Sequence, residues 1–93
     1  MRLTQYQRNI ITTTIKEFDP HAEIRLFGSR MDDHKKGGDI DIFIISARLS
    51  YRDKLAIRYK LKDKLGDRKI DILIKEQPDN AFSRFAYKNS III

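Results

Sequence analysis

Apolar side chains recur at helical spacing from the start of the chain, every three to four residues. Thr4 and Gln7 have the spacing of a capping box, in which each residue bonds the backbone N–H of the other. Pro20 stops the pattern because proline cannot continue a helix. These signals predict a first helix that ends near Phe18.

Two later stretches also have helical spacing. Ser50 and Asp53 are candidate caps of a second helix that runs to Leu65, with Gly66 as its stop signal. Asp79 is the candidate cap of a third helix. We expect the aromatic residues of this C-terminal stretch to be core and helix-packing residues, namely Phe82, Phe85 and Tyr87.

Strand patterns lie between the predicted helices. Residues 22–27 alternate apolar and polar side chains, and a polar loop follows over residues 29–38. Residues 39–45 are the most β-prone of the chain, and residues 69–74 have the same character. The last three isoleucines, residues 91–93, predict a short edge strand. We therefore expect an α/β (α+β) fold in which helices back a small mixed β-sheet.

Composition limits the class of protein without deciding it. With 93 residues and 41% hydrophobic residues, the chain predicts one domain over residues 1–93, with a marginal but self-sufficient core. It contains no cysteine, which excludes thiolate metal sites and cysteine nucleophiles. The first residues lack the apolar stretch of a secretory signal, and no apolar run could cross a bilayer, so we expect a cytoplasmic protein.

Positive charge predicts an affinity for phosphate-rich partners. The formal net charge is +6, which suits nucleotides, nucleic acids and acidic proteins alike. Part of the excess forms a basic ridge of Lys54, Arg58 and Lys62, four residues apart on the second helix. This ridge is a candidate surface for a partner or a nucleic acid, although a solvated helix face is the simpler explanation.

Two aspartates inside an apolar strand are the strongest chemical signal. Asp39 and Asp41 are separated by one residue, so both carboxylates project from the same face of the predicted strand. Adjacent anions repel each other, and aspartate is a poor strand former. A divalent cation such as Mg²⁺, which prefers carboxylate and phosphate oxygens, would compensate this cost. The alternative is a half-solvated strand with an acidic polar face.

Two further segments add to this signal. Asp71 lies in the third predicted strand, and if that strand lies next to the second, its carboxylate completes a cluster with Asp39 and Asp41. Three carboxylates and two metal ions are the parts needed for in-line nucleotidyl transfer. Gly28 and Ser29 directly follow the first predicted strand, where a tight turn and free N–H groups suit an anion.

The ordered motifs resemble the DNA polymerase β-like nucleotidyltransferase superfamily. Within it, the chain is similar to minimal nucleotidyltransferase (MNT) domains, the MntA-type antitoxins that pair with HEPN-domain toxins. The likeness covers nearly the whole chain and is carried by Leu26-Phe27-Gly28-Ser29-Arg30, Gly37-Gly38-Asp39-Ile40-Asp41 and Ile70-Asp71-Ile72.

The resemblance implies a role for each motif residue. Gly28 and Ser29 would bind the β- and γ-phosphates of ATP or another NTP, and Arg30 would pair with phosphate. Asp39 and Asp41 would hold Mg²⁺ in a two-metal site. Asp71 would be the third metal ligand and would help to deprotonate the acceptor hydroxyl.

The function that we expect first is transfer of AMP to a tyrosine of a separate HEPN-like helical protein. Larger relatives carry acceptor-recognition domains that these 93 residues do not hold, which is why we expect a second subunit. Two alternatives remain. A catalytically silent antitoxin would neutralise its partner by occlusion, and a nucleic-acid-binding module would use the basic ridge and ignore NTP.

Overall fold

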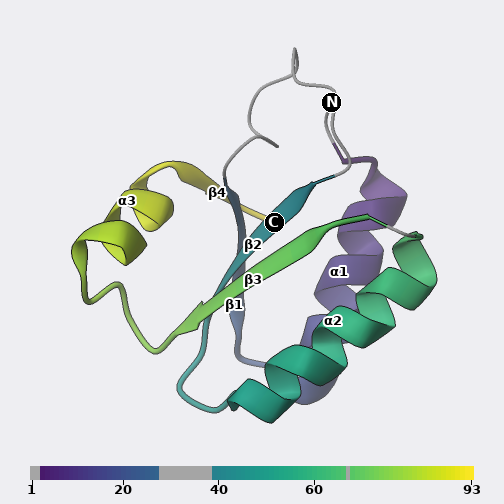
Figure 1. Ribbon diagram of the computed structural model, residues 1–93, viewed down its shortest axis with the longest axis horizontal. Helices are drawn as coiled ribbons and strands as arrows, with labels where there is room; N and C mark the ends of the chain where they lie inside the picture. The colour runs from purple at the N-terminus through teal and green to yellow at the C-terminus, as the bar shows by residue number, and fades with distance from the viewer. Residues whose placement is uncertain (1–2, 28–38, 67) are drawn as a thin grey trace.

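Three helices and four strands make up the described part of the chain, residues 3–27, 39–66 and 68–93 of a computed structural model (Figure 1). None of the described helices is long and apolar enough to span a bilayer. In chain order the elements are α1 (Gln5–Phe18), β1 (Glu23–Phe27), β2 (Ile40–Ile45), α2 (Tyr51–Leu65), β3 (Ile70–Lys75), α3 (Ala81–Lys88) and β4 (Ser90–Ile92).

The strands form one mixed sheet in the order β3-β2-β1-β4. β1 pairs antiparallel with β2 and with β4, whereas β2 and β3 are parallel. Parallel neighbours need a crossover connection, and α2 supplies it. The mixed sheet, the edge position of the C-terminal strand and the placement of β3 next to β2 confirm the sequence-based predictions.

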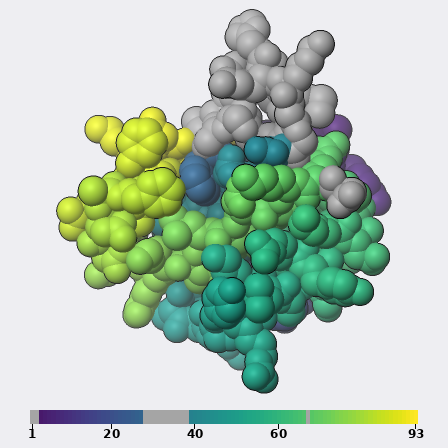
Figure 2. Space-filling view, in the orientation of Figure 1, coloured from purple at the N-terminus to yellow at the C-terminus, as the bar shows by residue number. Residues whose placement is uncertain are grey.

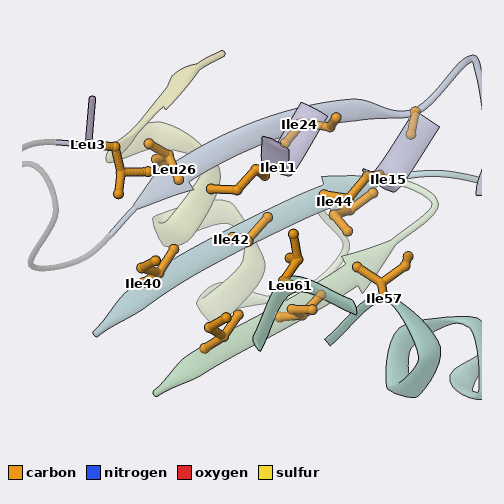
Figure 3. Packing of buried hydrophobic residues seen from close by; sticks show 13 residues of the cluster. Leu3, Ile11, Ile15, Ile24, Leu26, Ile40, Ile42, Ile44, Ile57 and Leu61 are labelled. Atoms are coloured by element: carbon orange, nitrogen blue, oxygen red, sulfur yellow. The ribbon is translucent and has the colours of Figure 1, made fainter. Parts of the chain in front are cut away.

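One face of the sheet carries the main core. Isoleucines at alternate positions of β2, such as Ile42 and Ile44, are fully buried against α1 and α2 (Figure 3). α1 contributes Ile11 and Ile15 to this layer. Phe43 projects from the opposite face because side chains alternate along a strand, and it is also fully buried. β2 is therefore covered on both faces, as its continuous apolar run predicts.

Each described helix begins with a capping box. Thr4 and Gln7 form the predicted box at α1, and Ser50 caps α2 with Asp53 as its reciprocal partner. Gly66 ends α2 with a positive φ of 92°, a conformation that favours glycine. The caps of α1 and α2 could be predicted from the sequence because each depends only on residues a few positions apart.

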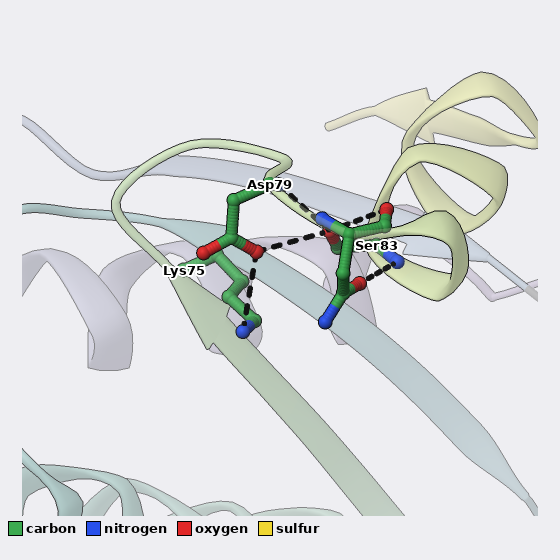
Figure 4. Close-up of polar contacts among 4 residues, drawn as sticks. Lys75, Asp79 and Ser83 are labelled. Atoms are coloured by element: carbon green, nitrogen blue, oxygen red, sulfur yellow. Dashed lines mark hydrogen bonds and ion pairs between the residues drawn. The ribbon is translucent and has the colours of Figure 1, made fainter.

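The predicted cap of the third helix is wrong by one residue. Asn80, not Asp79, caps α3, and its side chain accepts a hydrogen bond from the Ser83 N–H at 2.7 Å. The carboxylate of Asp79 instead forms an ion pair with Lys75 at 3.3 Å, across the turn that joins β3 to α3 (Figure 4). The helix begins one residue later than the prediction placed it, at Ala81, so Asn80 occupies the capping position.

The expectation that the C-terminal aromatic residues form core is also wrong. Phe82 and Phe85 are 59% and 64% exposed, and Tyr87 is 39% exposed. α3 turns its small residues Ser83 and Ala86 inward, which are both essentially buried. Small side chains let the helix lie close to the sheet, and the aromatic stripe therefore faces outward.

A buried polar network joins the end of α1 to the end of β2. The Ser46 hydroxyl donates a 2.6 Å hydrogen bond to the Asp19 carboxylate and accepts from the N–H groups of Arg48 and Leu49. This hydroxyl, with the His21 N–H second, holds the pKa of Asp19 below its usual range. The network sets the course of the chain from β2 toward α2.

Replacing Ser46 with alanine is expected to lower the free energy of unfolding by about 1–3 kcal/mol, because the buried Asp19 and two N–H groups lose their partner. A lowered folded-state pKa contributes stability above the unfolded value and loses it as pH falls through the folded value. The loss should therefore be largest near neutral pH and shrink below about pH 4. Urea unfolding at several pH values measures it.

Thr13→Ala is the matched control for this change, because Thr13 is an exposed residue of α1. Removing its hydroxyl should change stability by only a few tenths of a kcal/mol, in the stabilising direction, since alanine has the higher helix propensity (~0.5 kcal/mol). Equal losses in Ser46→Ala and Thr13→Ala would show that the Asp19 network contributes nothing.

Candidate active site

Asp41 and Asp71 lie side by side on the sheet. They are register partners in the parallel ladder of β2 and β3, and both side chains are half-buried. Neighbouring partners in a parallel pair project from the same face. The prediction that a third strand would lie next to the second and bring these two acids together is thus confirmed in its geometry.

Asp39 is the residue before β2 and lies two positions from Asp41, the spacing at which side chains of an extended chain project to the same side. Its negative charge is close enough to act on the Asp41 carboxyl. The third predicted acid therefore belongs to the same neighbourhood, at the ends where β2 and β3 begin.

Electrostatic repulsion is concentrated at Asp41. Partial burial is the largest cause that raises the pKa of this carboxyl above its usual range. The charges of Asp71 and Asp39 raise the pKa further, and so does a hydrogen bond between the side chains of Asp41 and Asp71. Lys69 acts in the opposite direction, and its Nζ lies 3.9 Å from a carboxylate oxygen of Asp71.

The donor set of Asp41 and Asp71 fits a magnesium ion that takes its remaining ligands elsewhere. Within residues 3–27, 39–66 and 68–93, no group of three or more His, Asp or Glu side chains is arranged to hold a metal ion. Mg²⁺ is usually bound by only one or two protein carboxylates, with substrate phosphates and water completing its shell. The raised pKa of Asp41 also indicates a place where a cation would relieve repulsion.

The predicted phosphate-binding residues lie outside the described residues. Gly28, Ser29 and Arg30 follow Phe27, the last residue of β1, and their role remains a prediction. Phe27 is the register partner of Asp41. The described part of β1 thus ends directly beside the acids. This is where β1 must end if the residues that follow it are to bind phosphate next to the acids.

The sequence profile of the family described as nucleotidyltransferase domain matches residues 8–93, which is most of the chain. The chain belongs to this nucleotidyltransferase family. No curated protein shows significant similarity to it.

Membership of this family makes the protein a transferase of nucleotidyl groups, with an NTP as the implied substrate. The observed α+β fold, four strands and three helices in the described residues, is consistent with it. The acid pair of this nucleotidyltransferase lies on the sheet face opposite α1 and α2, and Phe43 lies on that same face, two residues beyond Asp41. Phe43 thus places a buried apolar residue beside the acids.

The aromatic residues that face outward on α3 are the functional candidates that sequence reasoning missed. Phe82 and Phe85 were assigned to the core because an apolar stripe at helical spacing usually faces inward. The signal for the other outcome was Ser83 and Ala86, which share a face of the same helix and have the size that close packing on a sheet requires.

Proposed function

We propose that this nucleotidyltransferase transfers AMP from ATP, with Mg²⁺ as its cofactor, to a tyrosine hydroxyl of a separate HEPN-like helical protein. The modification would silence that protein, so that the pair acts as a cytoplasmic toxin and antitoxin. Residues 1–93 would form one minimal domain that carries the transfer chemistry. The paired acids Asp41 and Asp71 are the observation that carries the proposal.

In the proposed reaction, the tyrosine oxygen forms a bond to the α-phosphorus of ATP. The bond from that phosphorus to the bridging oxygen breaks, and pyrophosphate leaves with the electron pair. Asp39, Asp41 and Asp71 would hold the metal ion beside the triphosphate, and Asp71 would also take the hydroxyl proton. Mg²⁺, when bound, neutralises the charge that develops on the phosphates. Gly28, Ser29 and Arg30 would cradle the β- and γ-phosphates.

An exposed apolar surface supports the idea of a partner protein. Phe82, Phe85 and Ile92 are each 59% to 64% exposed, and they come from α3 and the neighbouring strand β4 (Figure 2). Large aromatic side chains in a group are the residues that dominate protein interfaces. β4 is also an edge strand, so its surroundings are accessible to another chain.

The test is to purify the protein and the HEPN-like helical protein that it is proposed to modify, and to incubate them with ATP and Mg²⁺. We expect the partner to gain the mass of one AMP on a tyrosine, and the gain to disappear when EDTA removes the metal. A partner mass that stays unchanged in the complete mixture would overturn the proposal.

Neutralisation by occlusion is the second candidate, because the same exposed surface of α3 would serve it without any chemistry. The double variant Asp39→Asn/Asp41→Asn separates the two. If the transfer is the antitoxin activity, cells that express the variant together with the toxic partner should stop growing. Full protection by the variant would favour occlusion.

A further inference from the structure

Two hollows lie between α2 and β3, the teal helix and the green strand that lie next to each other in Figure 2, and the two together are called the trough. Their volumes are about 520 Å³ and 350 Å³. The larger is lined by Tyr59 and Arg58 of α2 and reaches Asp71. The smaller continues past Tyr51 to Lys75, the end of β3.

The wall that β3 contributes is a sheet edge with open backbone groups. In the parallel ladder, the carbonyls of Lys69 and Lys75 accept from β2, so alternate residues of β3 face β2. Ile70, Ile72 and Ile74 must therefore point their N–H and C=O groups away from β2, toward the trough. Within the described residues, no backbone hydrogen bond outside the β2–β3 ladder engages these groups.

The trough is strongly basic. Five cations line it, and they are Lys54, Arg58, Lys62, Lys69 and Lys75. Asp71 is the sole acid among the lining residues that the structure describes. Lys69 and Lys75 have acidic neighbours, whereas no ion pair joins Arg58 or Lys62 to another described residue.

We propose that this trough binds an extended, acidic segment of the acceptor protein, which adds to the sheet as a strand beside β3. The inference rests on the proposed function and names the part of the acceptor that the site recognises. Backbone N–H and C=O groups of the segment would pair with those of Ile70, Ile72 and Ile74, and its acidic side chains would meet Arg58 and Lys62.

Strand addition also explains how the acceptor hydroxyl reaches the acids. A residue placed opposite Asp71 projects its side chain from the same sheet face as Asp71. The segment is proposed to run antiparallel to β3. In such a pair Asp71, which lies between Ile70 and Ile72, occupies a non-hydrogen-bonded position, where side chains of opposing residues are closest. A tyrosine at this position would lie beside Asp71, which takes its proton while the oxygen bonds to the α-phosphorus and pyrophosphate leaves.

A polypeptide suits the trough better than a nucleic acid does. The open edge presents donors and acceptors in alternation, and a peptide backbone offers both in the same order. A phosphate backbone supplies acceptors but hardly any donors, and would leave the three isoleucine carbonyls unpaired. The cations alone would suit either ligand, so the backbone groups decide between them.

The probe for the test is a fluorescent nine-residue peptide of alternating glutamate and threonine with one central tyrosine. We expect it to bind at least about tenfold more tightly than its lysine-for-glutamate counterpart, because the trough is basic. Arg58→Glu/Lys62→Glu should weaken its binding by about tenfold. Arg84→Glu/Lys88→Glu, which makes the same charge change on the exposed face of α3, should change it by less than about twofold.

N-methylation of the probe tests strand addition without altering the protein. Methyl groups on every second amide block one edge of the peptide, and methyl groups on the other amides block the opposite edge. One of the two methylated peptides should lose binding and the other should keep it, since only one edge faces β3. Equal binding of both would overturn the inference, as would tighter binding of a nine-nucleotide oligothymidylate that the Arg58→Glu/Lys62→Glu variant abolishes.

The outcomes separate this inference from the proposed function. Edge-selective binding of the probe without transfer of AMP would support the trough and contradict the proposed chemistry. Transfer to the partner protein that is equal in Arg58→Glu/Lys62→Glu and in the wild type would support the chemistry and overturn the trough.

Discussion

Nucleotidyl transfer should fall by at least about 10³-fold when Asp41 is replaced by asparagine, and the folded protein should become more stable at the same time. Activity falls because the neutral amide no longer attracts the cation that the paired carboxylates are proposed to hold. Stability rises because partial burial, and after it repulsion from Asp71 and Asp39, disfavours the charged form of Asp41 in the protein without metal. Removing this charge should raise the Tm by about 4 °C, the lower end of the shift that about 1 kcal/mol produces in a domain of this size.

Transfer of labelled AMP to the partner and thermal unfolding by circular dichroism, in EDTA, are the two measurements. Asp63→Asn is the matched control, because Asp63 is an exposed residue of α2 away from the acid pair. It should retain full activity. A variant Asp41→Asn that transfers AMP normally, or that melts well below the wild type, would contradict the role given to this carboxylate.

Replacing Phe43 with alanine should cost about 3–5 kcal/mol of folding free energy. Phe43 is fully buried on the face of β2 that carries the acids, where it packs edge-on against Phe27 with ring centroids 6.4 Å apart. The loss comprises the transfer free energy of the ring and the cost of the cavity that it leaves beside Phe27. In a domain whose total stability is only about 5–15 kcal/mol, the variant should be largely destabilised at 37 °C.

Phe85→Ala makes the same chemical change on the outer face of α3, where the ring is 64% exposed. It should change the free energy of unfolding by less than about 0.5 kcal/mol, as surface substitutions usually do. Urea unfolding of the two variants, with equal m-values, gives the comparison. Similar losses in both would contradict the burial of Phe43 in the folded protein.

Much of the site geometry could be predicted because it depends on short-range rules. Alternation along one strand places Asp39 and Asp41 on a common face, and the apolar residues around Asp71 identify another strand. That Asp41 and Asp71 are register partners could not be predicted, since register depends on the packing of α2 across the sheet. The parts of the site that rest on Gly28, Ser29 and Arg30 lie outside the described residues and stay predictions.

The errors of prediction in α3 have a common physical origin. Hydrophobic periodicity identifies an amphipathic helix, but it does not say which stripe a neighbouring sheet will accept. Close approach to the sheet favoured Ser83 and Ala86, so Phe82 and Phe85 were left outside. The capping error also concerns a choice between neighbouring residues. Asn80 caps the helix, whereas Asp79 forms an ion pair with Lys75.

The pairing of Ile40 with Ile70 and of Ile42 with Ile72 has an effect beyond packing. A slip of one residue between these strands would place an isoleucine where an acid must be and drive a carboxylate into the apolar layer beneath α1 and α2. The alignment of the acids in this protein is therefore fixed by hydrophobic packing rather than by interactions between charges. The acids need no separate supporting residues, because the buried isoleucines that form the core also hold the two carboxylates in register.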